Sequence, residues 1–593
     1  MNSHCPKLRD AKGSCDIVVI NNANSAAVLR LCSFLVRYSV SKAKMFPRLL
    51  GIARRTMNYL QRSGELVDMT NITGVVPLNK TGNNDTALND NTAQHSLGAG
   101  LPASPVGIVR SPWSSNDDSD VFEVHDPSTG ALMARVQGAG KDQVDAALLD
   151  AREVFDTSWR LVSPGNRASA LRHCAQLLRE HADEIAEIES REVGKPYQVS
   201  RNNDIEVCIA SFEFFAGQAQ ALHGEFFAGG PIDTYTIPEP YGVVVGIIPF
   251  NWPPIHAGAK AAAALAAGNV VILKPPEQCP FTVARIVEIL QGALPAGVLR
   301  CVPGLGKTTG AHLVSSPRVD RLSFTGSPNT AKQVMHSAAD NFTGALLELG
   351  GKNPFVVFND ADLDVAVPVA VEATFFNSGE ACTSASRIVV ESGIADEFSK
   401  RYVELVRQLV TGSPFEPGTH IGPMITAAHR DRVSSYIDIG IAEGAELAFR
   451  GDVPDDPSLA GGHWVPPIVF DHVDTKMRIA QEEIFGPVVT ILRFDTYEEG
   501  ISIANDTEFA LVAAVFTRDD MRYRRASRDI DAGVVFVNNY NRSFLPAPFG
   551  GNRASGYGRE HAAETLREYC KSKSVRVPSG NGTVPQRWHF TDK

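Results

Sequence analysis

Long apolar runs, paired cysteines and an excess of basic residues are all missing from this sequence. No stretch reaches the roughly 18 apolar residues that a membrane-spanning helix needs, so we expect no integral membrane segment. The nine cysteines are scattered and include no C-x-x-C pair, which predicts neither a disulfide framework nor a metal site. The net charge of -11 gives no general reason to expect a nucleic-acid partner.

The composition is that of a soluble globular enzyme with more than one domain. The 593 residues exceed the usual size of a single domain, and 44% hydrophobic with 21% charged residues is ordinary for such proteins. Unpaired cysteines fit a reducing compartment, which favours a cytoplasmic location.

The first 105 residues differ in composition from the rest. Residues 17–64 hold eight Lys or Arg and no acid, so a mitochondrial location stays open if residues 1–68 act as a transit segment. Asp10 and Asp16 argue against this interpretation, and a translation start at Met69 is the alternative. Residues 69–105 have the polar composition of a linker. We therefore predict that residues 1–105 form an N-terminal extension that is disordered or processed.

From residue 106 onward, short apolar runs alternate with helix-like segments. Long amphipathic helices are predicted within 146–201. The strands predicted after them cover 242–248, 269–273, 297–303, 321–324 and 345–349. The helices between these strands cover 256–267, 281–293, 307–315 and 329–338. A second series of strands covers 355–358, 387–390, 468–471, 488–493 and 534–538. This alternation predicts parallel sheets, so the expected fold class is α/β with two doubly wound domains.

Two segments carry residues suited to covalent chemistry. In Phe-Phe-Asn-Ser-Gly-Glu-Ala-Cys-Thr, Cys382 follows a glycine turn just past a helical stretch. Glu348 lies 34 residues earlier, at the end of an apolar strand and before two glycines, where α/β sheets place their ligands. Taken singly, Cys382 could be a packing residue and Glu348 a solvated carboxylate. Together they offer a thiol nucleophile and a general base.

Several motifs in residues 106–577 together resemble the aldehyde dehydrogenase superfamily. Glu348-Leu-Gly-Gly-Lys-Asn-Pro is similar to the family's glutamate motif, and residues 376–383 are similar to its cysteine motif, at the family's separation. Pro-Phe-Asn-Trp-Pro, which contains Asn251, is similar to the family's Pro-Trp-Asn-Phe-Pro element with the two aromatics exchanged. The resemblance implies an enzyme that oxidises an aldehyde to a carboxylic acid with NAD(P)+ through a cysteine thioester.

The resemblance also implies a role for each of three residues. Cys382 would be the nucleophile, Glu348 the general base for deacylation, and the Asn251 amide a donor to the oxyanion. Thiolate addition to an aldehyde makes a tetrahedral carbon whose hydride can leave, and an activated water then hydrolyses the thioester. The Cys382 backbone N–H would be the second oxyanion donor, and loss of one such donor typically costs ~3 kcal/mol, about a hundredfold in rate.

Four of the residues implied to bind the cofactor follow predicted strands. Lys274 and Glu277, in Lys-Pro-Pro-Glu, would bind the adenosine ribose. A carboxylate at this place repels a 2′-phosphate, so NAD is favoured and NADP stays possible. Gly326 and Ser327 open a helix whose N-terminus suits the pyrophosphate.

Two further cofactor residues lie in Glu-Glu-Ile-Phe-Gly-Pro, which is similar to the family's Glu-x-Phe-Gly-Pro element. Glu483 would hold the nicotinamide ribose and Phe485 would flank the nicotinamide ring. The alternative is a plain loop with one buried aromatic. The sequence departs from the family at Ala331, where a glycine is usual, and this adds a methyl group at a helix-packing position.

The resemblance divides the chain into regions. Residues 106–221 and 241–349 would form the cofactor-binding domain, 350–564 the catalytic domain, and 222–240 with 565–580 an oligomerisation arm. Edge strands of such an arm need a partner, so we expect a homodimer or homotetramer. Glu560, within the C-terminal signature, would either support Glu348 through water or form a structural salt bridge.

The substrate is the least constrained feature. Trp252, Phe376, Phe549 and Tyr540 suggest an apolar pocket for an uncharged aromatic or aliphatic aldehyde, although these side chains could equally belong to the core. Arg542 lies near the presumed mouth and leaves an acidic semialdehyde open.

Two rival functions remain. A CoA-acylating semialdehyde dehydrogenase forms the same thioester, but such relatives commonly lack a base at the position of Glu348. A non-catalytic binding protein on this scaffold is disfavoured because Cys382, Glu348 and Asn251 are all present.

Overall fold

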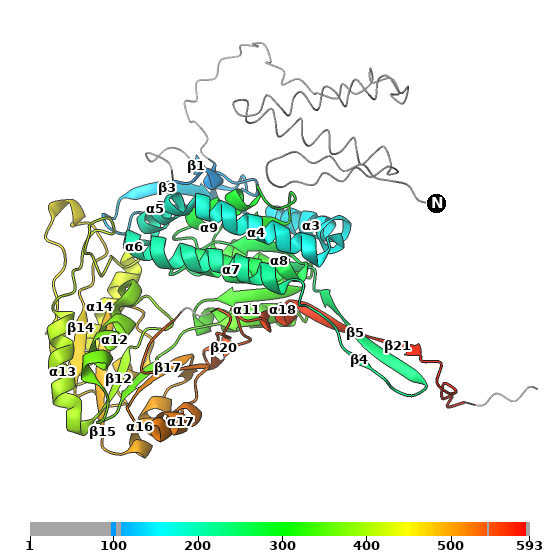
Figure 1. Ribbon diagram of the computed structural model, residues 1–593. Coiled ribbons are helices and arrows are strands. Elements are labelled where there is room, and N and C mark those ends of the chain that lie inside the picture. The colour runs from blue at the N-terminus through cyan, green and yellow to red at the C-terminus, as the bar shows by residue number, and fades with distance from the viewer. Residues whose placement is uncertain (1–95, 102–107, 543–544, 589–593) are drawn as a thin grey trace, which may run out of the picture. The chain divides into compact units, whose positions relative to one another are not determined.

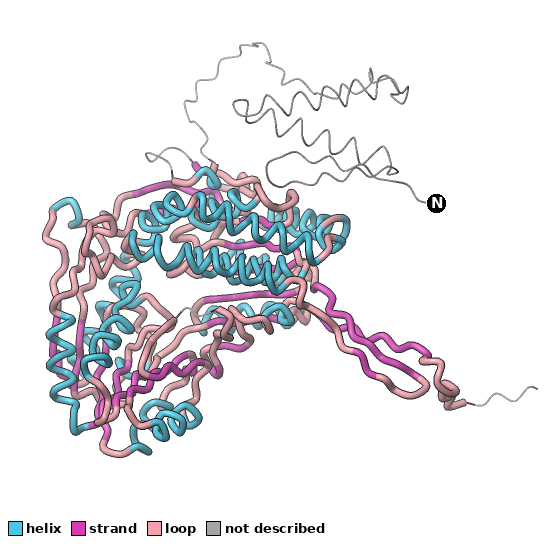
Figure 2. The backbone as a smooth tube through the Cα atoms, in the orientation of Figure 1, coloured by secondary structure: helices cyan, strands magenta, loops and turns pink. Residues whose placement is uncertain are grey.

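Two parallel-rich sheets organise this computed structural model, which describes residues 96–101, 108–542 and 545–588 (Figure 1). Residues 1–95, most of the predicted N-terminal extension, lie outside the described residues. The tube in Figure 2 shows helices packed along the strands of both sheets.

The first sheet is six-stranded, and its order is β20-β10-β9-β6-β7-β8. Its strands are β6 (Val243–Ile247), β7 (Val270–Lys274), β8 (Leu299–Cys301), β9 (Arg321–Thr325), β10 (Gly344–Glu348) and β20 (Gly556–Tyr557). All neighbours are parallel except β20, which pairs antiparallel with the edge of β10 at Glu348 and Gly556. The chain order of the strands reverses between β6 and β9, and ligands of open α/β sheets bind outside the carboxyl ends of strands at such a point.

Helices cover this first sheet, and the most buried of them is α8 (Pro253–Ala267). Most of its residues are alanine or glycine, so the helix lies close to its neighbours, and a Cβ on Gly258 would meet the Cα of Cys208 at 3.0 Å. Gly268, at φ 103, ends the helix in the left-handed conformation that glycine adopts without strain. The other helices of this part are α3 (Lys141–Thr157), α4 (Pro164–Glu180), α5 (Ala182–Val193), α6 (Tyr197–Val199), α7 (Ile205–Gln218), α9 (Phe281–Leu290), α10 (Ala311–Ser315) and α11 (Pro328–Ala339).

The second sheet has seven strands in the order β13-β14-β15-β12-β11-β17-β18. They are β11 (Pro354–Val357), β12 (Arg387–Glu391), β13 (Glu446–Arg450), β14 (Ile468–Asp471), β15 (Val488–Phe494), β17 (Val512–Phe516) and β18 (Val534–Val537). Phe355 and Val357 belong to one apolar core, and Val356 and Phe358 to another, so both faces of the sheet are buried. The helices of this part are α12 (Leu363–Phe375), α13 (Ser392–Val406), α14 (Ala427–Ala442), α15 (Arg478–Gln481), α16 (Tyr497–Asn505) and α17 (Asp520–Asp529).

The predicted fold class, α/β with two doubly wound sheets, is confirmed. The sequence reading missed β13, an antiparallel edge strand, and the central strand β17. It also assigned 307–315 to one helix, whereas residues 306–310 form a π-helical turn that leads into α10. The chain also returns from the second sheet to the first, because β20 follows all strands of the second sheet and pairs with β10.

A third sheet forms a separate ribbon that extends from the body of the described chain (Figure 1). It consists of β4 (Phe226–Phe227), β5 (Ile232–Pro240) and β21 (Cys570–Pro578), and β5 pairs with β21 over nine residues. Phe226, Phe227, Tyr235, Ile237 and Val577 are exposed apolar side chains on it. A helix, α18 (Thr565–Glu568), leads into β21.

The remaining strands are short: β1 (Ile108–Val109), β2 (Val121–His125), β3 (Leu132–Gln137), β16 (Phe509–Ala510) and β19 (Asn552–Arg553). Within the described ranges, none of the helices combines the length and apolar character needed to traverse a bilayer.

Candidate active site

A cavity of about 600 Å³ lies where the two sheets and the C-terminal segment meet, and Cys382 is in its wall. The wall also contains the aromatic residues Trp252, Phe376, Phe536 and Phe549. Its polar and charged members are Asn202, Asn203, Glu206, His256, Thr383, Asn539, Asn541, Arg542, Glu560 and His561. The cavity is therefore an apolar chamber with several polar groups and one thiol.

Cys382 lies in the loop between α12 and β12. Asn377 and Ser378 have positive φ values of 55 and 58, which makes the sharp turn that precedes the cysteine. Asn353 holds the loop from the other side, because its Nδ2 donates to the carbonyl oxygens of Cys382 and Ser384, both at 2.8 Å. Asn353 comes five residues after Glu348, so the glutamate and cysteine motifs are directly tied together.

Burial raises the pKa of the Cys382 thiol above its ordinary value, and the nearby Glu483 and Glu348 carboxylates raise it further. The thiol is therefore protonated near neutral pH. It becomes a nucleophile only when an acceptor takes its proton, since the thiolate is the reactive form.

Glu348 is the last residue of β10, and it is buried. Both carboxylate oxygens lack a hydrogen-bond partner among the described residues, and Oε1 lies against Gly550, where a Cβ would meet it at 2.6 Å. Burial raises the pKa of Glu348 well above its usual range, the charge of Glu560 raises it further, and Lys260 opposes the shift. Glu348 does not belong to the cavity wall in this conformation, whereas Glu560 does.

Glu560 forms an ion pair with a lysine that the sequence reading did not select. The buried Lys260 Nζ lies 3.0 Å from Glu560 Oε1 and donates to Ser323 Oγ at 3.1 Å. Of the two roles considered for Glu560, the structural salt bridge is thus present. The charge of Glu560 also acts on Glu348 through space.

Asn251 lies just beyond β6, at the point where the strand order of the first sheet reverses. Its side-chain Nδ2 donates to the carbonyl oxygen of Glu380 at 3.1 Å, two residues before the cysteine. A carboxamide has two N–H donors, so one fixes the side chain on the cysteine loop and the second is left for a ligand.

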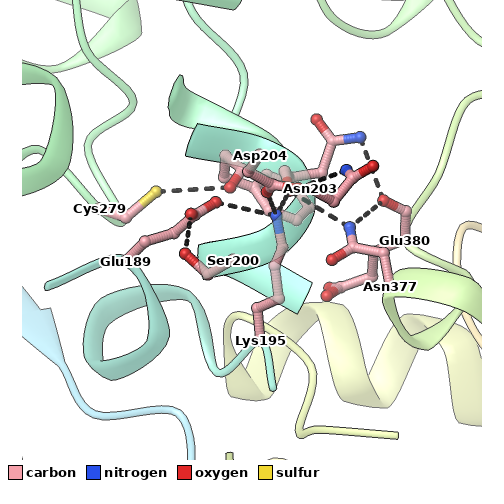
Figure 3. A network of polar contacts seen from close by, with 10 residues as sticks. Glu189, Lys195, Ser200, Asn203, Asp204, Cys279, Asn377 and Glu380 are labelled. Atoms are coloured by element: carbon pink, nitrogen blue, oxygen red, sulfur yellow. Dashed lines mark hydrogen bonds and ion pairs between the residues drawn. The ribbon is translucent and has the colours of Figure 1, made fainter. Parts of the chain in front are cut away.

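A buried ion cluster holds the main chain of Asn251. Figure 3 shows its charged members Glu189, Lys195 and Asp204 close together. Lys195 Nζ donates to the Asn251 carbonyl at 2.8 Å and to Glu189 Oε1 at 2.9 Å, and it also pairs with Asp204. Asn377 Nδ2 donates to the same Asn251 carbonyl at 3.2 Å. All charges of the cluster are fully buried, so Lys195 is held in one position and fixes the backbone next to the cavity.

The carboxyl end of β9 offers groups that fit a dinucleotide. Ser327 caps α11, since its Oγ accepts from Thr330 N, and the free first-turn N–H groups of a helix favour a phosphate. The Thr325 Oγ1 is buried and has no partner among the described residues, directly before Gly326. Ala331, the departure from the family pattern, is buried in the core beneath α11, so its extra methyl group is accommodated by packing.

Lys274 is the last residue of β7, Glu277 follows the strand, and the two form an ion pair of 3.7 Å. Glu277 Oε2 accepts from the N–H of Gly306 at 2.6 Å, while about a third of its side chain stays exposed, so the carboxylate has acceptor capacity left for a ribose hydroxyl. Burial lowers the pKa of Lys274, and its Nζ donates to the Pro275 carbonyl at 2.9 Å.

Glu483 and Phe485 lie beside the catalytic motifs. Glu483 Oε1 accepts from the N–H of Gly351 at 3.0 Å, and burial raises the pKa of Glu483 to about 7. The Phe485 ring packs edge-to-face on Phe250 with centroids 5.7 Å apart, next to Asn251. The structure thus brings Glu483 and Phe485 to the site of Asn251 and Cys382. Lys274 and Glu277 lie at the carboxyl end of the neighbouring parallel strand β7, on the same edge of the sheet as Asn251.

The sequence reading missed Lys195, His256 and Lys260. His256 and Lys260 are the only polar side chains in the apolar, alanine-rich run of α8, and their spacing of four places them on one helix face. This spacing is the feature of the sequence from which both residues could have been predicted to lie at the site. Lys195 gave no such signal, because its partners lie in other elements.

Comparisons with known proteins agree with these features. The family model described as "Aldehyde dehydrogenase family" matches residues 113–575. The chain is 45% identical to aldehyde dehydrogenase citD of Monascus ruber over 473 residues, which are 80% of this chain and 94% of that protein. It is 42% identical to an aldehyde dehydrogenase of Didymella fabae, over 80% of this chain and 96% of the relative.

Solved structures are similar as well. PnpE from Pseudomonas sp. WBC-3 has a TM-score of 0.77 and 36% identity, covering 79% of this chain and 96% of its own. Betaine aldehyde dehydrogenase from Staphylococcus aureus, in complex with NAD+, has a TM-score of 0.78 and 34% identity, covering 82% of this chain and 95% of its own.

Proposed function

The chain belongs to the aldehyde dehydrogenase family, and on that premise we propose how its residues divide the reaction between them. The protein is an NAD(P)-dependent enzyme that oxidises an aldehyde to a carboxylic acid. We assign Cys382 as the nucleophile, Glu348 as the base that activates water, and Asn251 as the oxyanion donor. The observation that carries the assignment is that hydrogen bonds from Asn353 and Asn251 to the cysteine loop join the three motifs, next to a cavity whose wall includes Cys382.

Cys382 begins the reaction by adding to the aldehyde carbon. The thiol passes its proton to solvent water, the sulfur forms a bond to carbon, and the carbonyl oxygen becomes an alkoxide. The second N–H of the Asn251 amide and the Cys382 backbone N–H would stabilise that negative charge. Lys195 supports this geometry because it fixes the Asn251 carbonyl.

Bound NAD+ supplies a hydride acceptor, and the sulfur then carries a thioester. Glu348 takes a proton from water, the resulting hydroxide adds to the thioester carbon, and the acid leaves as the Cys382 thiolate is restored. The described residues form no hydrogen bond to the Glu348 carboxylate, and this supports the role because its acceptor capacity is not spent on them.

The proposed cofactor residues of the first sheet lie at the carboxyl ends of its parallel strands β7 and β9. Gly326 and Ser327 would bind the pyrophosphate at the N-terminus of α11, and Lys274 with Glu277 would bind the adenosine ribose. The partly exposed Glu277 carboxylate supports a preference for NAD over NADP, because it repels a 2′-phosphate. Glu483 and Phe485 would bind the nicotinamide ribose and ring.

We propose an uncharged aromatic aldehyde as the substrate class. The aromatic walls Trp252, Phe376 and Phe549 and the cavity of about 600 Å³ support this choice. An acidic semialdehyde is the second candidate, favoured by Arg542 in the wall. Arg542 forms no ion pair with any described residue, and its Nη2 donates to the Ala373 carbonyl at 2.6 Å.

We also propose a homodimer or homotetramer assembled through the ribbon of β4, β5 and β21. The exposed apolar side chains on this ribbon support a partner, since a three-stranded sheet with open faces is a poor isolated unit. Sedimentation of a chain lacking residues 571–577 should give monomers, and an unchanged oligomer would contradict the assignment.

Replacing Cys382 by serine tests the proposed function most directly. NADH formation with aromatic aldehydes should be abolished, while NAD still raises the melting temperature, because the thiol bonds the substrate and not the cofactor. Turnover near the wild-type rate would remove Cys382 from the mechanism.

A further inference from the structure

Five buried polar atoms without a hydrogen-bond partner among the described residues belong to the cavity wall. They are Trp252 Nε1, His256 Nδ1, His256 Nε2, Thr383 Oγ1 and Arg542 Nε. Buried donors and acceptors are nearly always satisfied in folded proteins, so such a concentration in one cavity points to a ligand that satisfies them. A plain hydrocarbon aldehyde would leave most of them unpaired.

His256 is the most informative of these groups. Its side chain is 7% exposed, on the first turns of α8, four residues after Trp252 and four before Lys260. Burial lowers the pKa of His256 to about 3, and the positive charge of Lys260 adds to the effect. The ring is therefore neutral at physiological pH and presents one N–H donor and one acceptor nitrogen, and neither has a partner among the described residues.

A hydroxyl group matches a neutral imidazole better than a carboxylate does. A hydroxyl can either accept from the protonated ring nitrogen or donate to the unprotonated one, whereas a carboxylate can only accept. A neutral ring also offers an anion no charge. Trp252, the residue that precedes α8, also belongs to the cavity wall, and its Nε1 can donate to the same oxygen or to a second one.

We propose that His256, with Trp252, makes this cavity selective for aromatic aldehydes that carry a hydroxyl group on the ring. The inference rests on the proposed function and specifies its substrate class. The aromatic wall holds the ring of such a substrate, and the unpaired nitrogens hold its hydroxyl group. His256 is then a specificity-determining residue that touches the substrate and takes no part in bond making.

The test compares 3-hydroxybenzaldehyde with 3-methylbenzaldehyde, and the 4-substituted pair in the same way. A methyl group has nearly the size of a hydroxyl but cannot form hydrogen bonds, so the ratio of the two kcat/KM values isolates the hydrogen bond. We expect the wild type to prefer the hydroxyl compound of at least one pair by about tenfold to a hundredfold, since unpaired buried groups penalise the methyl analogue.

Three variants test whether His256 causes this preference. His256→Phe should abolish it and leave the two compounds equal, while His256→Gln, which keeps a donor and an acceptor, should retain part of it. His336→Phe is the matched control, because His336 is an exposed histidine of α11 outside the cavity wall, and it should leave the ratio unchanged. Comparing ratios cancels the intrinsic reactivity of each aldehyde.

The outcomes separate this inference from the function on which it rests. If no aldehyde of the panel yields NADH, the proposed aromatic substrate class fails. If the aldehydes are oxidised but hydroxyl and methyl compounds are equivalent in the wild type, only the role of His256 is overturned. A wild-type preference for 3- or 4-carboxybenzaldehyde over both would likewise overturn it and favour Arg542 as the recognising group.

Discussion

Glu348→Gln separates the two halves of the proposed reaction. Glutamine has the shape of glutamate but cannot take a proton from water. The Glu348 carboxylate makes no hydrogen bond to any described residue, so the substitution removes no protein contact. It also removes a buried negative charge that Glu560 opposes, so the fold should tolerate the change.

The expected magnitude follows from the role of the base. A positioned general base typically contributes about 10²–10⁴-fold, so thioester hydrolysis should slow by that factor, whereas thiol addition and hydride loss need no water. If the two half-reactions are equally fast in the wild type, a hundredfold slowing of hydrolysis gives a first burst of about 0.98 NADH per active site. The steady rate after the burst should fall with the hydrolysis step.

Rapid mixing of the variant with NAD and an aromatic aldehyde measures both phases through NADH absorbance. The pH dependence gives a second readout, because only the ionised carboxylate accepts a proton. Burial and Glu560 raise the pKa of Glu348, so wild-type hydrolysis should speed up as pH rises through that elevated pKa, and the variant should lack this increase.

A first turnover that is itself slowed would mean that Glu348 instead takes the proton of Cys382. Steady turnover restored by free CoA far beyond water would favour the acylating enzyme. First and later turnovers that both run at the wild-type rate would falsify the assignment of Glu348 altogether.

Three further substitutions test other parts of the structure. Glu277→Gln should raise the ratio of kcat/KM for NADP to that for NAD, because the charge facing a 2′-phosphate is removed; an unchanged ratio would place Glu277 away from the ribose. Lys195→Met should lower the free energy of unfolding by about 3–5 kcal/mol in urea titrations, since it leaves the buried Glu189 and Asp204 charges uncompensated. Adding neutral Gln and Asn at those two positions should recover much of the loss, and no recovery would argue against the charge cluster as its cause. Ala331→Gly should cost about 1–2 kcal/mol in the same titration, through lower helix propensity and a lost buried methyl group, and a gain in stability would show that this methyl is crowded.

The sequence predicted the parts of the fold that repeat locally. Buried parallel strands appear in the sequence as short apolar runs, and the boundaries of nearly every one were predicted to within a few residues. The central strand β17 was missed because Val512–Phe516 follows another apolar stretch with no turn signal between them. The edge strand β13 was missed because its half-exposed residues give a weak pattern.

The candidate site was predictable only where residues lie in contiguous motifs. Membership of the family and use of a nicotinamide cofactor are confirmed, whereas the individual roles of Cys382, Glu348 and Asn251 stay predictions. The ion pairs of Lys195 and Lys260 could not be predicted from the sequence, since their partners lie on other elements, up to 300 residues away along the chain in the case of Glu560. Both lysines matter because their charges are buried, and that burial is visible only in the folded chain.

The pairing of β20 with β10 sets an order of events during biosynthesis. Ser555 Oγ donates to the carbonyl of Gly350 across 205 residues of chain, and the two strands meet at Glu348. A nascent chain can already contain every proposed catalytic residue and still lack β20 and Glu560. The edge of β10 is then open, and Lys260 has no carboxylate to pair with. An open edge strand tends to pair with other chains, and a contact between residues so far apart in the sequence forms slowly. The enzyme is therefore expected to stay inactive on the ribosome until residue 560 has emerged, and a nonsense mutation before that residue should yield an aggregating product despite an intact Cys382.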